Sequence, residues 1–210
     1  MTGGHDPTAV RWTGVPLAEA ARAMVLLHGR GASPEDILGI VQYLPADGLA
    51  LAAPAASGRT WYPKSFLAPE AENQPWLDSA LALVHGLLDQ VEAAGIPSER
   101  LFLLGFSQGA CLALESAARR PRRYGGVFAL SGGLIGLGAN PREFPGDLAG
   151  TPVIMGCSDV DPHIPKERFE ASAAVLRDMG ADVQDALYPG FGHAVHEDEI
   201  RRIRQVLTGP

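Results

Sequence analysis

The chain has 210 residues, of which 46% are hydrophobic and 20% are charged, and its formal net charge is −7. This length and composition fit one globular domain over residues 1–210 and exclude a disordered chain. The acidic balance argues against binding to nucleic acid or to an anionic membrane surface, because either partner needs a basic face.

The termini and cysteines indicate a cytoplasmic protein. Residues 1–7, which include His5, are expected to be flexible and lack the basic and apolar regions of a signal peptide. No apolar stretch approaches the roughly 20 residues of a membrane-spanning helix, so we expect no membrane span. Cys111 and Cys157 lie in apolar segments, which is typical of reduced thiols in a protein core.

The first half of the chain alternates predicted strands and helices. Apolar runs predict a short edge strand at residues 8–13 and strands at 23–27 and 49–53. The unbroken run at 23–27 is typical of a strand that is covered on both faces, and therefore of a mostly parallel sheet. Helices are predicted from Ser33, as N-cap, to Pro45 and from Pro75 to Gly95.

A long irregular stretch, residues 54–76, separates those two helices. Segments of this length without regular structure are usually functional in compact domains. This one is rich in proline and aromatic residues, among them Trp61, Tyr62 and Phe66. We therefore expect it to form one wall of a binding site.

The pattern G-x-S-x-G occurs at residues 105–109, directly after the apolar run 101–104 and before a segment that favours a helix. This arrangement is typical of a nucleophile elbow, in which a serine sits on a strained turn between a strand and a helix. A random chain of this composition would contain the pattern with a probability of roughly 0.14, so the pattern alone is weak evidence. Ser107 is the candidate nucleophile.

Three further strands are predicted at residues 127–130, 153–155 and 183–188, with helices at about 165–179 and at the C-terminal end. Alternating strands and helices over the whole length predict an α/β doubly wound sheet, whose ligands bind at the carboxyl ends of the strands. Ser107, an aspartate near residue 160 and His193 follow three of these strands. Their order along the chain is that of the α/β hydrolases.

A serine hydroxyl needs a histidine to accept its proton and a carboxylate to orient that histidine. We favour His193 over His196, because His193 lies in the loop directly after a strand, whereas His196 is expected to be a solvated helix residue. For the carboxylate, spacing leaves Asp159 and Asp161 as nearly equal alternatives. The proline after Asp161 fixes an extended backbone at Asp161. Asp159 could equally be a turn residue whose side chain bonds its own backbone.

A tetrahedral oxyanion needs two backbone N–H donors. The residue after the nucleophile, Gln108, supplies one, and Arg30 in the sequence His28-Gly29-Arg30-Gly31 supplies the other, because the flanking glycines permit a close approach. Read alone, that sequence is equally consistent with a tight turn. We expect His28 to brace this loop and not to transfer protons.

Five motifs together resemble the phospholipase/carboxylesterase family of α/β hydrolases, which includes acyl-protein thioesterases. They are Leu26 to Gly31, Gly105 to Gly109, Leu130 to Gly133, Asp161-Pro162-x-Ile164-Pro165 and Gly190-x-Gly192-His193. The resemblance covers about residues 22–205. It implies an α/β-hydrolase fold with a mostly parallel sheet, helices on both faces and no separate cap domain. It also implies a triad of Ser107, Asp161 and His193, an oxyanion hole from the amides of Arg30 and Gln108, and no metal or cofactor.

Arg30 departs from the apolar residue of the thioesterases, and its side chain either binds an anionic substrate group or points to solvent. Aromatic and aliphatic residues of two loops are candidates for an apolar substrate pocket, and the alternative is that they only pack the loops onto the domain: Trp61, Tyr62, Phe66, Leu134 and Ile135. The leading hypothesis is a serine hydrolase, monomeric or homodimeric, that cleaves small to medium carboxylic esters. A thioesterase and a non-catalytic ligand-binding scaffold are the alternatives.

Overall fold

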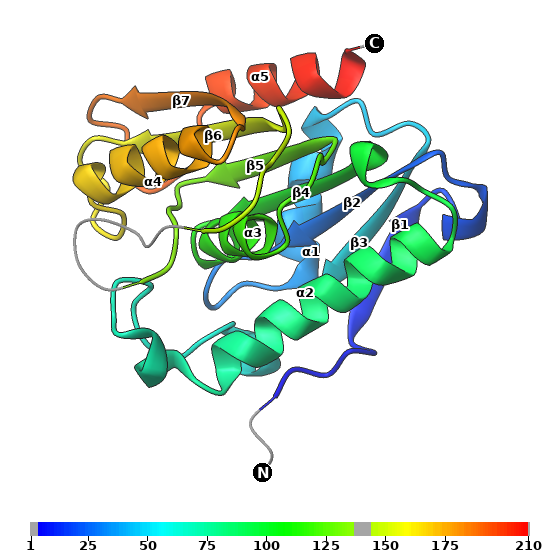
Figure 1. Ribbon diagram of the computed structural model, residues 1–210, viewed down its shortest axis with the longest axis horizontal. Coiled ribbons are helices and arrows are strands. Elements are labelled where there is room, and N and C mark those ends of the chain that lie inside the picture. The colour runs from blue at the N-terminus through cyan, green and yellow to red at the C-terminus, as the bar shows by residue number, and fades with distance from the viewer. Residues whose placement is uncertain (1–3, 137–143, 210) are drawn as a thin grey trace.

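The computed structural model describes residues 4–136 and 144–209 and contains a seven-stranded sheet (Figure 1). The strand order is β1-β3-β2-β4-β5-β6-β7. Only β1 is antiparallel to its neighbour, and every other adjacent pair is parallel. The strands are β1 (Val10–Gly14), β2 (Arg22–Leu27), β3 (Leu49–Pro54), β4 (Leu101–Phe106), β5 (Gly126–Leu130), β6 (Pro152–Ser158) and β7 (Asp182–Tyr188). The predicted mostly parallel α/β sheet is confirmed, including its edge strand.

Strand β2 illustrates why the apolar runs are continuous. Its side chains alternate between two hydrophobic clusters, with Ala23, Val25 and Leu27 on one face of the sheet and Met24 and Leu26 on the other. All five are at most 1% exposed. A strand that is buried on both faces has no position for a polar residue, which produces the unbroken pattern.

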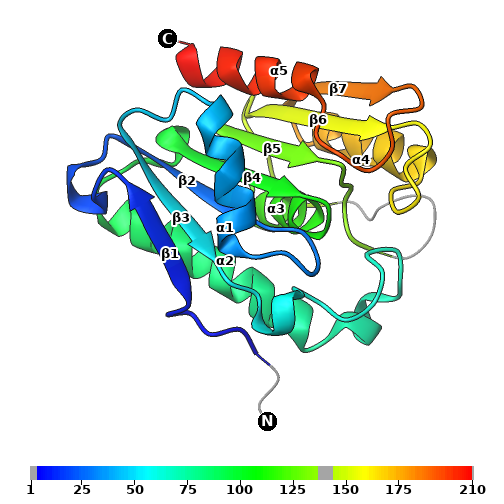
Figure 2. The same ribbon diagram turned by 180° about the vertical axis from the view of Figure 1, so that it is seen from behind.

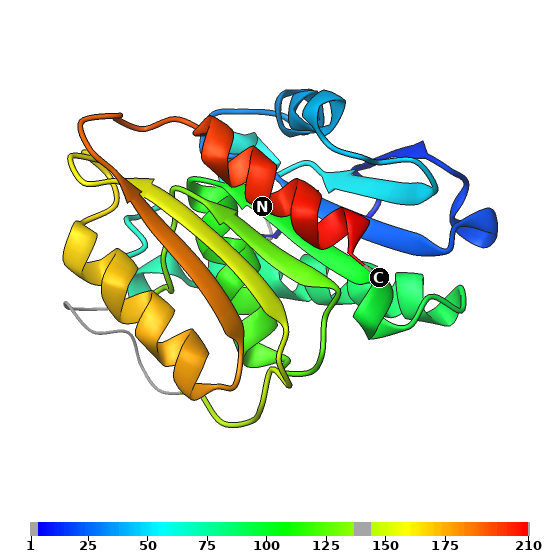
Figure 3. The same cartoon turned by 90° about the horizontal axis from the view of Figure 1, so that it is seen from above.

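In the described part of the chain, five α-helices cover the two faces of the sheet: α1 (Pro34–Leu38), α2 (Trp76–Ala93), α3 (Gln108–Arg119), α4 (Lys166–Asp178) and α5 (Glu197–Thr208). Helices α2, α3 and α4 contribute to the larger cluster, and α1 and α5 pack on the opposite face. Figure 3 shows the sheet between these two layers. None of the described helices is long and apolar enough to cross a membrane.

Local signals place the helix ends. Ser33 and Asp36 form a reciprocal capping box at the start of α1, as the sequence predicts for Ser33. The α-helix is shorter than expected, because residues Gly39–Tyr43 continue it as a 3-10 helix, which lies with α1 on the face seen in Figure 2. In α2 five apolar residues at helical spacing are all buried: Leu77, Leu81, Val84, Leu88 and Val91.

The N-terminal segment differs from the expected flexible one at His5, which is only 8% exposed. The backbone N–H of Ser57 donates to His5 Nδ1 at 3.0 Å, so Nε2 carries the proton and donates to the carbonyl of Trp61 at 2.9 Å. The ring also packs against Trp61 and Trp76, at centroid distances of 5.4 and 5.5 Å. The sequence predicted a free terminus because these partners lie more than 50 residues away.

Candidate active site

The candidate nucleophile occupies a strained turn between β4 and α3. Ser107 has φ 54° and ψ −119°, values that L-residues rarely adopt. The glycines around it are required by space, because a Cβ atom on Gly105 would lie 2.2 Å from the carbonyl oxygen of Gly109. A Cβ atom on Gly109 would lie 2.1 Å from the carbonyl oxygen of Leu27. The G-x-S-x-G pattern therefore forms the predicted strand, turn and helix.

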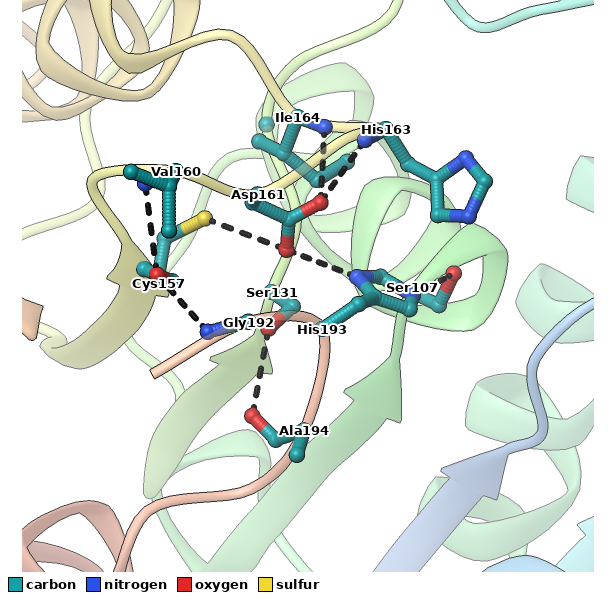
Figure 4. A network of polar contacts seen from close by, with 12 residues as sticks. Ser107, Ser131, Cys157, Val160, Asp161, His163, Ile164, Gly192, His193 and Ala194 are labelled. Carbon is teal, nitrogen blue, oxygen red and sulfur yellow. Dashed lines mark hydrogen bonds and ion pairs between the residues drawn. The ribbon is translucent and has the colours of Figure 1, made fainter. Parts of the chain in front are cut away.

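A continuous chain of hydrogen bonds joins the three predicted catalytic side chains (Figure 4). Ser107 Oγ lies 2.8 Å from His193 Nε2, and His193 Nδ1 lies 2.7 Å from Asp161 Oδ2. His193 comes from the loop after β7 and Asp161 from the loop after β6. The carboxyl ends of three parallel strands thus bring together residues that are 86 and 32 positions apart.

Asp161 is held as an anion beneath the histidine. Its Oδ1 accepts hydrogen bonds from the backbone N–H groups of His163, at 2.8 Å, and Ile164, at 3.1 Å. The Cys157 thiol donates to Oδ2 at 3.6 Å. Burial by itself would raise the pKa of Asp161, but the hydrogen bonds from His193 and the backbone outweigh it and lower the pKa. An ionised carboxylate in this position fixes the histidine with its proton on Nδ1.

The competing aspartate has a different contact. Asp159 Oδ1 accepts from the backbone N–H of Gly190 at 2.8 Å, and Ser158 Oγ accepts from Gly192 N–H at 2.9 Å. Both contacts fix the loop that carries His193. Spacing in the sequence did not separate Asp159 from Asp161, and the structure places Asp161 against the histidine.

His196 does not reach the site. It is the N-cap of α5, where its Nδ1 accepts from Asp198 N–H at 3.1 Å. Its ring stacks on Tyr188 at a centroid distance of 3.9 Å. The expectation of a solvated helix residue was wrong, because this ring is half-buried between aromatic side chains.

Two backbone N–H groups next to the serine are unused. Neither the N–H of Arg30 nor that of Gln108 donates to an acceptor among the residues that the structure describes. Both residues line the same cavity as Ser107. Free N–H groups beside a nucleophile can receive a developing oxyanion.

His28 fixes the peptide unit that contains the Arg30 N–H. Ala56 N–H donates to His28 Nε2 at 3.1 Å, so Nδ1 carries the proton and donates to the carbonyl of Gly29 at 2.7 Å. The carbonyl and N–H of a trans peptide point in opposite directions, so holding the Gly29 oxygen also aims the Arg30 N–H. Burial lowers the pKa of His28, which keeps the ring neutral in this role. The geometry agrees with the expectation that His28 braces the loop.

A cavity of about 490 Å³ opens beside Ser107. Of the predicted pocket residues, Tyr62 and Phe66 line it. Among the further lining residues are four that had no predicted place in the pocket: Phe106, Cys111, His163 and Ile164. Phe106 and Ile164 lie within the catalytic motifs themselves, which is the signal that would have identified them.

The other three predicted pocket residues, Trp61, Leu134 and Ile135, are fully buried and do not line the cavity. Trp61 Nε1 donates to the carbonyl of His28 at 2.8 Å, so this indole fastens its loop to the end of β2. Leu134 and Ile135 belong to the larger hydrophobic cluster. Their apolar side chains are used for packing, which sequence could not distinguish from ligand binding.

The Arg30 side chain makes contacts that neither reading of the sequence included. Its guanidinium donates to the carbonyls of Tyr62, Pro63 and Lys64, at 3.0, 3.1 and 2.7 Å. It is exposed, yet three protein acceptors hold it. Within residues 4–136 and 144–209, no group of three or more His, Cys, Asp or Glu side chains is arranged to hold a metal ion.

Comparisons with known proteins agree with this architecture. A family model described as Phospholipase/Carboxylesterase matches residues 15–208. The crystal structure of a phospholipase/carboxylesterase from Dyadobacter fermentans has a TM-score of 0.93 and 42% identity, over 98% of both chains. A protein of Oryza sativa subsp. japonica named probable carboxylesterase is 31% identical over 91% of this chain and 80% of its own length. Acyl-protein thioesterase 1 of Gibberella zeae is 35% identical over 59% of this chain and about half, 53%, of its own length.

Proposed function

We propose a function that starts from the family of this chain, which belongs to the phospholipase/carboxylesterase family. The proposed function is that of a serine hydrolase, which cleaves carboxylic esters through an acyl-enzyme. The observation that carries the proposal is the hydrogen-bonded series Ser107, His193 and Asp161, with contacts of 2.8 and 2.7 Å. A serine, a histidine and a carboxylate in this order provide a nucleophile, a general base and an orienting anion.

Acylation begins when Ser107 Oγ attacks the ester carbonyl carbon and its proton moves to His193 Nε2. The imidazolium that forms is stabilised by Asp161, which accepts the hydrogen bond from Nδ1–H. The tetrahedral oxyanion accepts hydrogen bonds from the N–H groups of Arg30 and Gln108. Collapse breaks the bond to the alcohol oxygen, which leaves with the proton from His193.

Deacylation repeats these steps with water. His193 Nε2 removes a proton from the water as its oxygen attacks the acyl carbon, and the same N–H groups hold the second oxyanion. Collapse releases the carboxylic acid and returns the proton to Ser107 Oγ. Every proton that leaves the serine or the water passes through one ring nitrogen, which makes the His193 contact the decisive one.

The cavity supports substrates of small to medium size. A volume of about 490 Å³ lies within the usual range for small-molecule sites. Phe66, Phe106 and Ile164 give it an apolar wall for an acyl or alcohol group. We therefore expect short acyl esters to be turned over faster than long-chain ones.

A fluorophosphonate and a series of p-nitrophenyl esters test the proposal. The folded protein should gain one adduct, located on Ser107 by peptide mass spectrometry, and should release p-nitrophenol. Ser107→Ala should fold with unchanged thermal stability and lose both signals. A folded wild-type protein that shows neither an adduct nor turnover would refute the hydrolase function.

Thioester hydrolysis is the second candidate, because the chain also matches an acyl-protein thioesterase. Esters and thioesters share the mechanism above, so the structure favours neither bond. A panel that pairs each acyl chain as an ester and as a thioester, compared by kcat/KM, distinguishes the two. The remaining alternative, a non-catalytic scaffold, requires a ligand whose affinity survives Ser107→Ala. A cytoplasmic location and a monomeric or homodimeric state stay predictions from the sequence.

A further inference from the structure

The loop at residues 59–65 is bound by the side chain of Arg30. Two nitrogens of the guanidinium make these bonds, with Nη1 donating to Pro63 and Nη2 donating to Tyr62 and Lys64. Three of the five N–H donors of an arginine are therefore used on consecutive carbonyls of one loop. The planar shape of the guanidinium allows it to reach all three at once.

The Gln108 side chain binds the same loop. Its Oε1 accepts from the backbone N–H of Trp61 at 2.9 Å and from Thr60 Oγ1 at 3.2 Å. Its Nε2 donates to the carbonyl of Tyr62 at 2.8 Å. Gln108 is only 6% exposed, so these bonds replace water that the amide would otherwise contact.

The two side chains meet at one atom, the carbonyl oxygen of Tyr62. It accepts from Arg30 Nη2 at 3.0 Å and from Gln108 Nε2 at 2.8 Å. A carbonyl oxygen has two lone pairs, so these two donors saturate it. The Tyr62 carbonyl therefore links the two residues that are the candidate oxyanion donors, both of which line the same cavity as Ser107.

We propose that the Arg30 side chain is a positioning residue for the oxyanion hole, because it and the Gln108 side chain anchor both oxyanion N–H donors to the Tyr62 carbonyl. The inference rests on the serine hydrolase function proposed above. In this proposal Arg30 has two separate roles. Its backbone N–H binds the oxyanion, and its side chain holds that N–H in place.

The Arg30 backbone needs such an anchor. Glycines flank it on both sides, and Gly31 has φ 79°, a conformation that other residues rarely adopt. Peptides next to glycine rotate at low cost, and an N–H that rotates away from the site no longer stabilises an oxyanion. His28 holds the carbonyl end of the peptide that carries the Arg30 N–H, and the guanidinium holds the Arg30 side of it.

The loop is itself fixed to the rest of the domain. Buried Asn73 accepts from Lys64 N–H at 2.8 Å and donates to the carbonyl of Ser65 at 3.0 Å. Gly31 N–H donates to the carbonyl of Arg59 at 2.7 Å. Because the loop at residues 59–65 is held at several points, its carbonyl groups can restrict the movement of Arg30.

Arg30→Met tests the proposal, since it keeps an unbranched side chain of similar length and removes all donors. Arg30→Lys keeps the charge with a single donor group. The matched control is Arg11→Met, because Arg11 is an exposed residue of β1 without a side-chain hydrogen bond or ion pair among the described residues. Each protein is measured for kcat and KM on a neutral p-nitrophenyl ester. The affinity for a boronic acid that forms a tetrahedral adduct and the hydrogen exchange of residues 59–65 are also measured.

We expect Arg30→Met to lower kcat about 10- to 100-fold, a part of the roughly 100- to 1,000-fold effect of losing one oxyanion donor. KM should change less than about 2-fold, and boronate affinity should fall by the same factor as kcat/KM, because both report the tetrahedral state. Exchange in residues 59–65 should become faster. Arg30→Lys should recover part of each loss, and Arg11→Met should match the wild type.

Two results would overturn the inference while leaving the hydrolase function intact. One is an Arg30→Met protein, folded as judged by its Tm, that keeps the wild-type kcat and boronate affinity. The other is a loss of kcat with unchanged exchange in residues 59–65, which would mean that Arg30 acts on the substrate directly. A wild-type protein without turnover and without a Ser107 adduct would instead refute the proposed function and this inference together.

Discussion

Glu199, at the start of α5, is a buried acid whose ionisation should control stability. The side chain is 1% exposed, and its Oε1 has no hydrogen-bond partner among the described residues. Oε2 accepts from His196 N–H at 2.6 Å. Burial is the largest influence and raises the pKa of Glu199 from 4.5 to about 8, against the smaller opposing effect of the His196 hydrogen bond.

The sign of the effect follows from linkage. In the unfolded chain Glu199 ionises above its ordinary pKa of 4.5, whereas in the folded protein it stays protonated up to about pH 8. Between these values the folded state binds more protons, so its stability falls as pH rises. Each pH unit in that window costs about 1.4 kcal/mol, so the step from pH 5.5 to 7.5 costs about 3 kcal/mol.

Glu199→Gln should remove this dependence, because the amide has nearly the same shape and does not ionise. Between pH 5.5 and 7.5, the unfolding free energy of the variant relative to that of the wild type should therefore rise by about 3 kcal/mol. In thermal unfolding this corresponds to roughly 6 to 12 °C for a domain of this size. Urea titrations at four pH values measure the slope, and all other titrating groups cancel in the difference.

Glu197→Gln is the matched control, since Glu197 is an exposed residue of the same helix turn. Its stability should follow the wild-type pH profile. If Glu199→Gln also ran parallel to the wild type, Glu199 would be ionised in the folded protein at neutral pH, and the reasoning from burial would be wrong.

Three further predictions concern the catalytic residues and the packing around them. Asp161→Asn should lower kcat by about 10⁴ at neutral pH, because an amide favours the wrong tautomer of His193; unchanged kcat in a folded variant would contradict the triad. Gly109→Ala should destabilise the protein by more than about 3 kcal/mol in urea unfolding, since its Cβ atom would meet the Leu27 carbonyl at 2.1 Å. Gly86→Ala, on the exposed side of α2 with no atom within 4 Å of its Cβ atom, should instead raise stability by about 0.5 to 1 kcal/mol, and a loss there would refute the packing assignment.

The sequence determined those features that depend on local chemistry. Continuous apolar runs predicted a sheet covered on both faces, and the capping residues predicted where helices begin. The elbow was predictable for the same reason, because two glycines, a serine and the strand before them lie within nine consecutive residues. Each of these signals acts through neighbours along the chain, so it can be read without knowing the fold.

The tertiary structure decided which of several similar residues meets a distant partner. Asp161 and Asp159 are two positions apart, yet only Asp161 contacts a histidine 32 residues away. Arg30 binds carbonyls more than 30 residues away, which neither of its two readings anticipated. Hydrogen bonds and burial depend on what the whole chain brings to a point in space, whereas residue type and spacing describe only one strand or turn at a time.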